Sequence, residues 1–166
     1  PEELAPNYRM SEPLAAIGAA QLTKLESIVA RRNHAGARLT AKLADIPGVL
    51  PPVTHPGNTH TYWFYLMRLD LNALKVTRAE FVDSLKSQGV SASAGYIPMA
   101  VYRYKVFQNH NFFGGTWPAR DFGATTMDYT KVCCPVAEAI LEDCVVMPLN
   151  EAMSDGYIDK VALAIR

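Results

Sequence analysis

Two short stretches of the 166-residue sequence combine side chains that could bind charged or hydroxylated ligands. The first contains Asn7 and Arg9, an amide and a guanidinium just ahead of a helix that is predicted to start at Ser11. Beside the N–H groups of a helix start, such side chains can hold a phosphate or a carboxylate. The alternative is that Asn7 and Arg9 only cap and solvate a turn.

The second stretch is aromatic and basic and contains Tyr96, Tyr102 and Arg103. Aromatic rings stack on the faces of sugar rings, and phenol and guanidinium groups form hydrogen bonds with hydroxyls and phosphates. These three residues, with Tyr8 from the first stretch, are therefore candidates for binding a sugar or a cyclitol. The alternative is that some of the tyrosines belong to the hydrophobic core.

No residue of the sequence stands out as a nucleophile or as a metal ligand. A lysine that forms a Schiff base is usually set in an apolar pocket, whereas the lysines here fall on predicted helix faces or in polar loops. The cysteines, Cys133, Cys134 and Cys144, are odd in number, which argues against a disulfide framework. Adjacent cysteines cannot easily share one tetrahedral ion, so we expect no metal site and no catalytic residue in this sequence.

The first stretch leads into one long predicted helix, from Ser11 to Leu43. Ser11 is a suitable N-cap, and Pro13 stands in the first turn, where its missing N–H is not needed. Apolar residues then recur at three- and four-residue spacing, so the helix has one face to bury. Its first turns are rich in alanine and include Gly18, which costs about 1 kcal/mol relative to alanine. That cost predicts close packing against a neighbouring layer or subunit; the alternative is a simple alanine-rich helix.

Strands and helices alternate after an irregular connection at 45–60. Residues 61–69 are aromatic or large and apolar on both faces, which predicts a central strand covered on both sides. Thr77 and Glu80 form a capping box, which predicts a helix at 77–88. Further strands are predicted at 91–96 and 144–148, and further helices at 135–141 and 154–166.

This order predicts an α+β fold, a small and mainly antiparallel sheet backed by helices and entered by the long N-terminal helix. The segment 108–131 interrupts it as a long polar and aromatic loop, and loops of that length are often functional. Lys and Arg number 16, as do Asp and Glu, and no basic run is interleaved with aromatic residues. Nucleic acid and anionic membranes are therefore not expected as partners. The apolar runs are too short for a membrane span or a signal peptide, so we expect a cytoplasmic protein.

Two blocks of residues together resemble one enzyme family. The first block is Asn7-Tyr8-Arg9-Met10, Glu12, Ala15-Ala16-Ile17-Gly18, Gln21-Leu22, Leu25 and Arg31-Arg32. The second block is Gly89-Val90, Pro98, Tyr102, Pro135-Val136-Ala137-Glu138, Val146, Met147-Pro148-Leu149 and Ile158. Both are similar to the DegT/DnrJ/EryC1/StrS sugar aminotransferases, which have the aspartate aminotransferase fold type. The resemblance covers nearly the whole chain apart from 45–60 and 108–131.

The resemblance implies that this chain is the C-terminal part of an enzyme that uses pyridoxal 5′-phosphate. Residues 1–43 would be the linking segment and interdomain helix, and 44–166 the small domain. The Schiff-base lysine and the acid beside the pyridine nitrogen would belong to a large domain ahead of residue 1. The resemblance also implies that Asn7 and Arg9 contact the cofactor, with Asn7 reaching the phosphate held by the partner subunit of a homodimer.

The implied reaction is transfer of an amino group from glutamate or glutamine to a keto sugar or a cyclitol. Many family members that act on nucleotide sugars have a histidine shortly after the proline equivalent to Pro98, whereas Met99, Ala100 and Val101 follow it here. This departure favours a cyclitol or another keto substrate. Two alternatives remain, a non-catalytic relative that serves as a sensor or interaction protein, and an unrelated α+β binding module.

Overall fold

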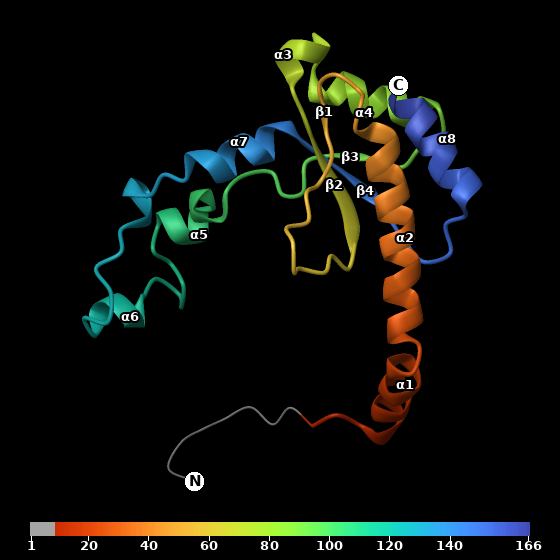
Figure 1. Ribbon diagram of the computed structural model, residues 1–166. Coiled ribbons are helices and arrows are strands. Elements are labelled where there is room, and N and C mark those ends of the chain that lie inside the picture. The colour runs from red at the N-terminus through yellow and green to blue at the C-terminus, as the bar shows by residue number, and fades with distance from the viewer. Residues whose placement is uncertain (1–8) are drawn as a thin grey trace.

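The computed structural model describes residues 9–166, and its centre is a sheet of four antiparallel strands (Figure 1). The strand order is β1-β2-β4-β3. Tyr65 of β2 lies opposite Met147 of β4, and Ser93 of β3 lies opposite Val146. The strands are β1 (Val49–Leu50), β2 (Phe64–Leu69), β3 (Ser93–Ala94) and β4 (Cys144–Pro148).

One face of the sheet is buried beneath three helices, α2 (Leu25–Leu43), α4 (Arg78–Ser87) and α8 (Asp155–Ile165) (Figure 1). These helices and the sheet bury a single continuous apolar core, whose removal from water is the main stabilising contribution to the fold. Its largest fully buried side chains are Tyr65, Met67 and Leu69 from β2, Leu39 and Leu43 from α2, and Leu85 and Ile158 from α4 and α8.

The remaining helices are short or lie outside this core. Helix α7 (Pro135–Asp143) contacts β2, and Figure 1 shows it leading away from the sheet toward α5 and α6. Helix α1 (Glu12–Leu22) lies at the far end of α2, also away from the sheet (Figure 1). The other elements are α3 (Leu71–Leu74), α5 (Lys105–Gln108), α6 (Pro118–Asp121) and the 3-10 turns η1 (Val101–Arg103) and η2 (Tyr129–Lys131).

The helix predicted as one piece from Ser11 to Leu43 is two helices, α1 and α2. The break is at Thr23, whose hydroxyl donates to the Ala20 carbonyl at 2.9 Å. The Lys24 amide donates to the Gln21 carbonyl at 3.0 Å, a bond to the third residue back instead of the fourth. This tighter turn ends α1 locally. Ser11 stands at the N-cap of α1, but its side chain makes no capping hydrogen bond.

The expectation that the central strand is covered on both sides holds for one face only. Tyr65 and Met67 of β2 are fully buried, whereas Phe64, Leu66 and Arg68, which alternate with them, are only half-buried. Alternation places these three on the opposite face of the sheet. That face carries a charge as well, because the Arg68 Nε donates to the Asp143 carboxylate at 2.8 Å.

The helix starts follow the sequence closely in the second half of the chain. The Thr77 side chain and Glu80 make the predicted reciprocal capping box at the start of α4. Ser154 caps α8 by accepting a hydrogen bond from the Tyr157 amide at 3.2 Å, and α7 begins at Pro135. The predicted strand at 144–148 is β4, but the predicted strand at 91–96 is reduced to the two residues of β3.

The sequence did not predict β1, since Val49 and Leu50 fall between turn residues in the segment taken as irregular. Their pairing with β2 makes β2 an interior strand, as its apolar composition indicates. The predicted fold class, an α+β domain with a small antiparallel sheet backed by helices, is confirmed. Across residues 9–166, no helix is both long enough and apolar enough to cross a membrane.

Candidate functional site

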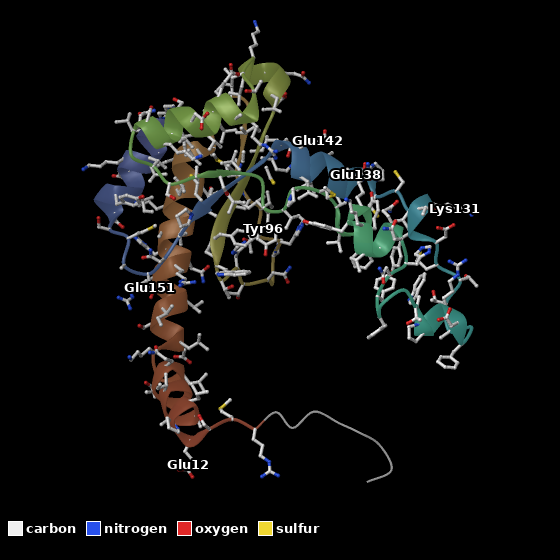
Figure 2. The ribbon with its side chains drawn as sticks, turned by 180° about the vertical axis from the view of Figure 1, so that it is seen from behind. Glu12, Tyr96, Lys131, Glu138, Glu142 and Glu151 are labelled. Atoms are coloured by element: carbon white, nitrogen blue, oxygen red, sulfur yellow. The ribbon has the colours of Figure 1, made fainter. Side chains whose placement is uncertain are left out.

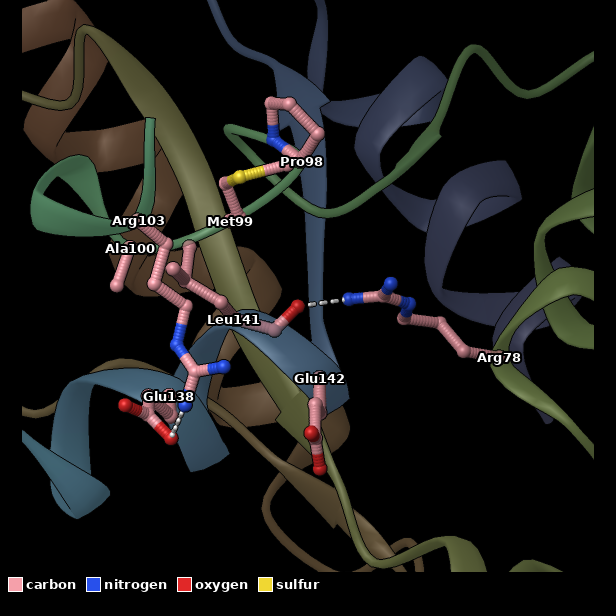
Figure 3. Close-up of a pocket in the computed structure, with 8 residues that line it drawn as sticks. All are labelled: Arg78, Pro98, Met99, Ala100, Arg103, Glu138, Leu141 and Glu142. Carbon is pink, nitrogen blue, oxygen red and sulfur yellow. Dashed lines mark hydrogen bonds and ion pairs between the residues drawn. The ribbon is translucent and has the colours of Figure 1, made fainter. Parts of the chain in front are cut away.

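A cleft of about 230 Å³ lies where the segment after β3 passes α7 (Figure 3). One wall is apolar and comes from the segment that includes Met99 and Ala100, and the other belongs to α7 and α4. The cleft brings together two guanidinium and two carboxylate side chains within a small volume. Its lining residues are Arg78, Pro98, Met99, Ala100, Arg103, Glu138, Leu141 and Glu142.

Glu138 is the residue that organises the polar side of the cleft. Its carboxylate accepts a hydrogen bond from Arg103 Nη2 at 2.9 Å (Figure 3). It also accepts one from the Tyr102 hydroxyl. The Tyr102 oxygen in turn accepts a hydrogen bond from the Cys134 amide at 3.0 Å. These hydrogen bonds connect the 3-10 turn η1 to the start of α7. We refer to Tyr102, Arg103 and Glu138 as the Glu138 cluster.

The hydrogen bonds of the Glu138 cluster favour the charged forms of Glu138 and Arg103. The hydrogen bond from the Tyr102 hydroxyl, followed by that from Arg103, lowers the pKa of Glu138. The hydrogen bond to Glu138 raises the pKa of Arg103. The carboxylate and the guanidinium are therefore both charged at neutral pH, and Arg103 presents a planar, oriented donor group beside the cleft.

Arg78 fixes the end of α7 that forms the back of the cleft. Its guanidinium donates to the Leu141 carbonyl (Figure 3). It also donates to the Cys144 carbonyl at 3.4 Å. These carbonyls belong to the last turn of α7 and the start of β4, where helical partners are lacking. Gly95 permits this arrangement, because a Cβ on it would stand 3.1 Å from Arg78 Nη1.

The structure brings together two of the six residues that the sequence nominated for binding. Tyr102 and Arg103 are joined through Glu138. Tyr96 is half-exposed with its ring 5.2 Å from that of Phe64, and it is not among the residues lining the cleft. Arg9 is exposed ahead of α1, while Asn7 and Tyr8 lie outside the described residues.

The start of α1, just after Arg9, and the cleft are far apart within this chain. Figure 2 shows Glu12, at the start of α1, at the opposite end of the N-terminal helices from Glu138 and Glu142 on α7. A site that used both Arg9 and the Glu138 cluster would therefore have to draw them from different copies of the chain. The resemblance likewise implies a contact between subunits, in which Asn7 reaches the cofactor phosphate of its partner, and this stays a prediction.

Sequence reasoning missed Glu138, Arg78 and Glu142 as cleft residues. Glu138 is quoted in the second block of the resemblance, but an acidic residue in the first turn of a helix is already explained by the helix dipole. Nothing in the spacing of Tyr102 and Glu138, which are 36 residues apart, indicates that they meet. The one available signal was that Tyr102 and Glu138 both belong to the second block of residues that resembles the family.

None of the lysines, all of which lie in the described part of the chain, is buried. Lys42 is half-buried and the others are exposed. Within residues 9–166, no three His, Cys, Asp or Glu side chains are grouped so that they could hold a metal ion. The groups that the described residues bring together at the cleft are the charged and aromatic side chains of the Glu138 cluster.

The fold of this chain is that of the small C-terminal domain of fold type I aminotransferases. Helicobacter pylori PseC, described as an aminotransferase of pseudoaminic acid biosynthesis, shares it with a TM-score of 0.73 at 18% identity over 98% of this chain. A model of the DegT/DnrJ/EryC1/StrS aminotransferase family matches residues 2–166, and the chain belongs to this family.

Two further relatives are more similar to this chain in sequence. The spore coat polysaccharide biosynthesis protein SpsC of Bacillus subtilis is 27% identical over 165 residues, which are 98% of this chain. The aminotransferase TlmJ of Streptoalloteichus hindustanus is 25% identical, with a TM-score of 0.63 over 92% of this chain. The chain spans only 38% of the length of SpsC and 35% of that of TlmJ.

Proposed function

We propose that this chain is the C-terminal domain of a pyridoxal-phosphate-dependent aminotransferase that transfers an amino group to a keto sugar or a cyclitol. The match of the family model across residues 2–166 is the observation that carries the proposal. The domain division proposed is a linking segment and interdomain helices at 1–43 and a small domain at 44–166. The whole protein would be a cytoplasmic homodimer, with a large domain that this chain does not contain.

In this proposal the Glu138 cluster contributes to binding the keto substrate. Arg103 is held by Glu138 with its guanidinium beside the cleft, so its remaining N–H groups can donate to substrate hydroxyls or to a phosphate. Tyr102 is held in the same way, and its ring offers an apolar face. Glu138 acts as a positioning residue, because its bonds define where Tyr102 and Arg103 lie.

The apolar wall of the cleft supports a cyclitol or another keto substrate without the usual nucleotide-sugar arrangement. Met99 and Ala100 line the cleft next to Pro98, where the family resemblance leads us to expect a histidine in enzymes that act on nucleotide sugars. Neither side chain can donate a hydrogen bond to a substrate. Tyr96, which does not line this cleft, remains a proposed substrate contact. Tyr8 remains one as well and lies outside the described residues.

Among the described residues, Arg9 is suited to help bind the phosphate of pyridoxal phosphate. When bound, the cofactor supplies an electron sink for cleavage of bonds at the amino-bearing carbon. Arg9 stands just ahead of the 11-residue helix α1, and a guanidinium beside a helix start suits a phosphate. Together with Asn7, it would hold the cofactor phosphate of a partner subunit. None of the lysines is buried, which supports assigning the Schiff-base lysine to the large domain.

The proposal is tested by assaying the full-length protein with pyridoxal phosphate, glutamate or glutamine as amino donor, and panels of keto cyclitols and keto sugar nucleotides. We expect amino transfer to a keto cyclitol or a free keto sugar. Glu138→Gln should raise KM for that acceptor by about 10-fold or more, with a smaller effect on kcat, because a charge-assisted contact is no longer positioned. Glu142→Gln is the matched control, since Glu142 lines the same cleft outside the cluster.

A second measurement separates an enzyme from a non-catalytic relative. The 166-residue chain mixed with pyridoxal phosphate and reduced with borohydride should show no single, stoichiometrically labelled lysine. The full-length protein should show one, in the part that precedes this chain. If the full-length protein binds the cofactor and transfers no amino group to any acceptor, the sensor or interaction function replaces the enzymatic one.

A further inference from the structure

Two adjacent thiols, Cys133 and Cys134, are exposed where the chain enters α7. Cys134 is the N-cap residue of that helix, and its backbone is not helical, with φ −126° and ψ 77°. The third cysteine, Cys144, is fully buried at the start of β4. A reagent that reacts with thiols in the folded chain therefore meets the adjacent pair first.

The peptide group that joins Cys133 to Cys134 is hydrogen-bonded to the Glu138 cluster. Its N–H, the amide of Cys134, donates to the Tyr102 oxygen at 3.0 Å. The Tyr102 hydroxyl donates to the Glu138 carboxylate, which also holds Arg103. A rotation of this one peptide group would thus remove a hydrogen bond from the cluster that borders the cleft.

Binding both sulfurs to one atom requires such a rotation. The backbone around this peptide group is not helical: Val132 has extended dihedral angles, and Cys134 has φ −126° and ψ 77°. In extended backbone, successive side chains point to opposite sides of the chain. A ligand that bridges Cys133 and Cys134 must bring the two side chains to the same side, and the peptide group between them has to turn. Tetrahedral metal ions need further ligands, and the described residues offer no group of three that could supply them.

We propose that Cys133 and Cys134 form a dithiol site for thiophilic ligands of the trivalent arsenical class, and that occupying this site breaks the Cys134–Tyr102 hydrogen bond. An organic arsenical needs only two protein ligands, since its third bond is to its own carbon. The hydrated reagent, R–As(OH)₂, exchanges two hydroxyl groups for two thiols, forming two As–S bonds and releasing two water molecules. Arsenic remains trivalent, so the step needs no oxidant or reductant.

The test uses phenylarsine oxide and the full-length protein. We expect binding of one reagent molecule by this pair, reversed by dithiothreitol and resistant to an equal concentration of a monothiol. Trypsin releases all three cysteines in the peptide 132–160, and cleavage at Glu138 and Glu142 separates Cys133 and Cys134 from Cys144. Mass spectrometry should place the adduct on residues 132–138.

Single substitutions distinguish a bridging site from one reactive thiol. Cys133→Ser and Cys134→Ser should each weaken binding by about 100-fold or more, because the second As–S bond forms at a high effective concentration only when both thiols are present. Cys144→Ala is the matched control and should leave binding at this pair unchanged. Equal affinity in either serine variant, or removal by the monothiol, would overturn the proposal of a dithiol site.

Hydrogen exchange tests the link to the cleft without relying on any enzymatic activity. The Cys134 amide should exchange at least several-fold faster when the arsenical is bound, since its hydrogen bond to Tyr102 is broken. Tyr102→Phe should accelerate the same amide without the reagent, and the arsenical should then add little. Unchanged exchange at Cys134 in the loaded protein would contradict the proposed coupling.

Discussion

Helices α1 and α2 follow one another along the chain, and each carries a glycine in its interior, yet their surroundings differ. A Cβ on Gly36 of α2 would come within 2.5 to 2.7 Å of the Tyr62 ring, whereas a Cβ on Gly18 of α1 would have nothing within 4 Å. Helix α2 buries four residues in the core, and α1 buries none. Packing within this chain therefore explains the glycine in α2, and it does not explain the glycine in α1.

The two helices also differ in polar contacts. Helix α2 is joined to α8 by ion pairs, among them a two-bond contact in which Arg38 Nε and Nη2 lie 2.8 Å from the Asp159 carboxylate. On α1, by contrast, Leu14, Ile17 and Leu22 are all more than half exposed. Apolar side chains cost free energy when left in water. We therefore infer that α2 packs against the core of this chain. We also infer that the exposed apolar side chains of α1 contact the proposed large domain or a second subunit.

The largest expected effect is that of Gly36→Ala, which should destabilise the fold by up to about 3 kcal/mol. The Tyr62 ring that the new Cβ would strike is buried, is 4.0 Å from the His60 ring and stacks on Tyr65. It has little room to withdraw. Chemical denaturation followed by circular dichroism measures the loss. A double variant with Tyr62→Leu should recover part of it, and a Gly36→Ala protein as stable as the parent would refute this account of α2.

Asn7→Ala in the full-length protein should weaken retention of pyridoxal phosphate, by about 2 kcal/mol if a charge-assisted hydrogen bond to the phosphate is lost. The measurement is cofactor affinity, followed by absorbance during dialysis. Mixed dimers that pair this variant with a subunit lacking the Schiff-base lysine would show whether the contact crosses between chains. Unchanged cofactor affinity and turnover would leave Asn7 only the local role of capping and solvating the turn.

Gly18→Ala tests whether another part of the protein packs on α1, through the sign of its effect on stability. In the 166-residue chain, the added Cβ meets no neighbour, so the substitution should stabilise α1 by about 1 kcal/mol through helix propensity. In the full-length protein we expect the opposite sign if another backbone packs on this face. Thermal denaturation of both proteins gives the two signs. A stabilising effect in both would show that α1 is a simple alanine-rich helix.

The sequence predicted elements that local interactions specify and missed those that distant residues specify. The capping box at Thr77 was read correctly because its partners are three residues apart. The break at Thr23 was missed, because a threonine in a helical pattern gives no sign that its hydroxyl will bond the Ala20 carbonyl. The candidate site followed the same rule: Tyr102 and Arg103 were nominated by residue type, whereas the role of Glu138 depends on a contact between distant segments.

The smallest effect concerns pH and the contact between α2 and α8. The hydrogen bonds from Arg38 lower the pKa of Asp159 to about 2. Because the folded state holds this carboxylate ionised more strongly than the unfolded chain, where the pKa is about 3.9, its contribution to stability is complete above that value. It is lost as the pH falls through 3.9 toward 2. Both side chains are still partly exposed to solvent, which screens the pair and keeps the contribution small.

Asp159→Asn isolates this contribution from those of other carboxylates. The variant should be less stable than the parent at pH 7, and the difference should shrink steadily between about pH 5 and pH 2, where the parent's own carboxylate becomes protonated. Denaturation midpoints across this range give the difference directly. Asp83→Asn is the matched control, since Asp83 is exposed and stands 3.9 Å from Lys86 within α4. If the Asp159 difference persisted at pH 2, the side chain would act through packing instead of charge.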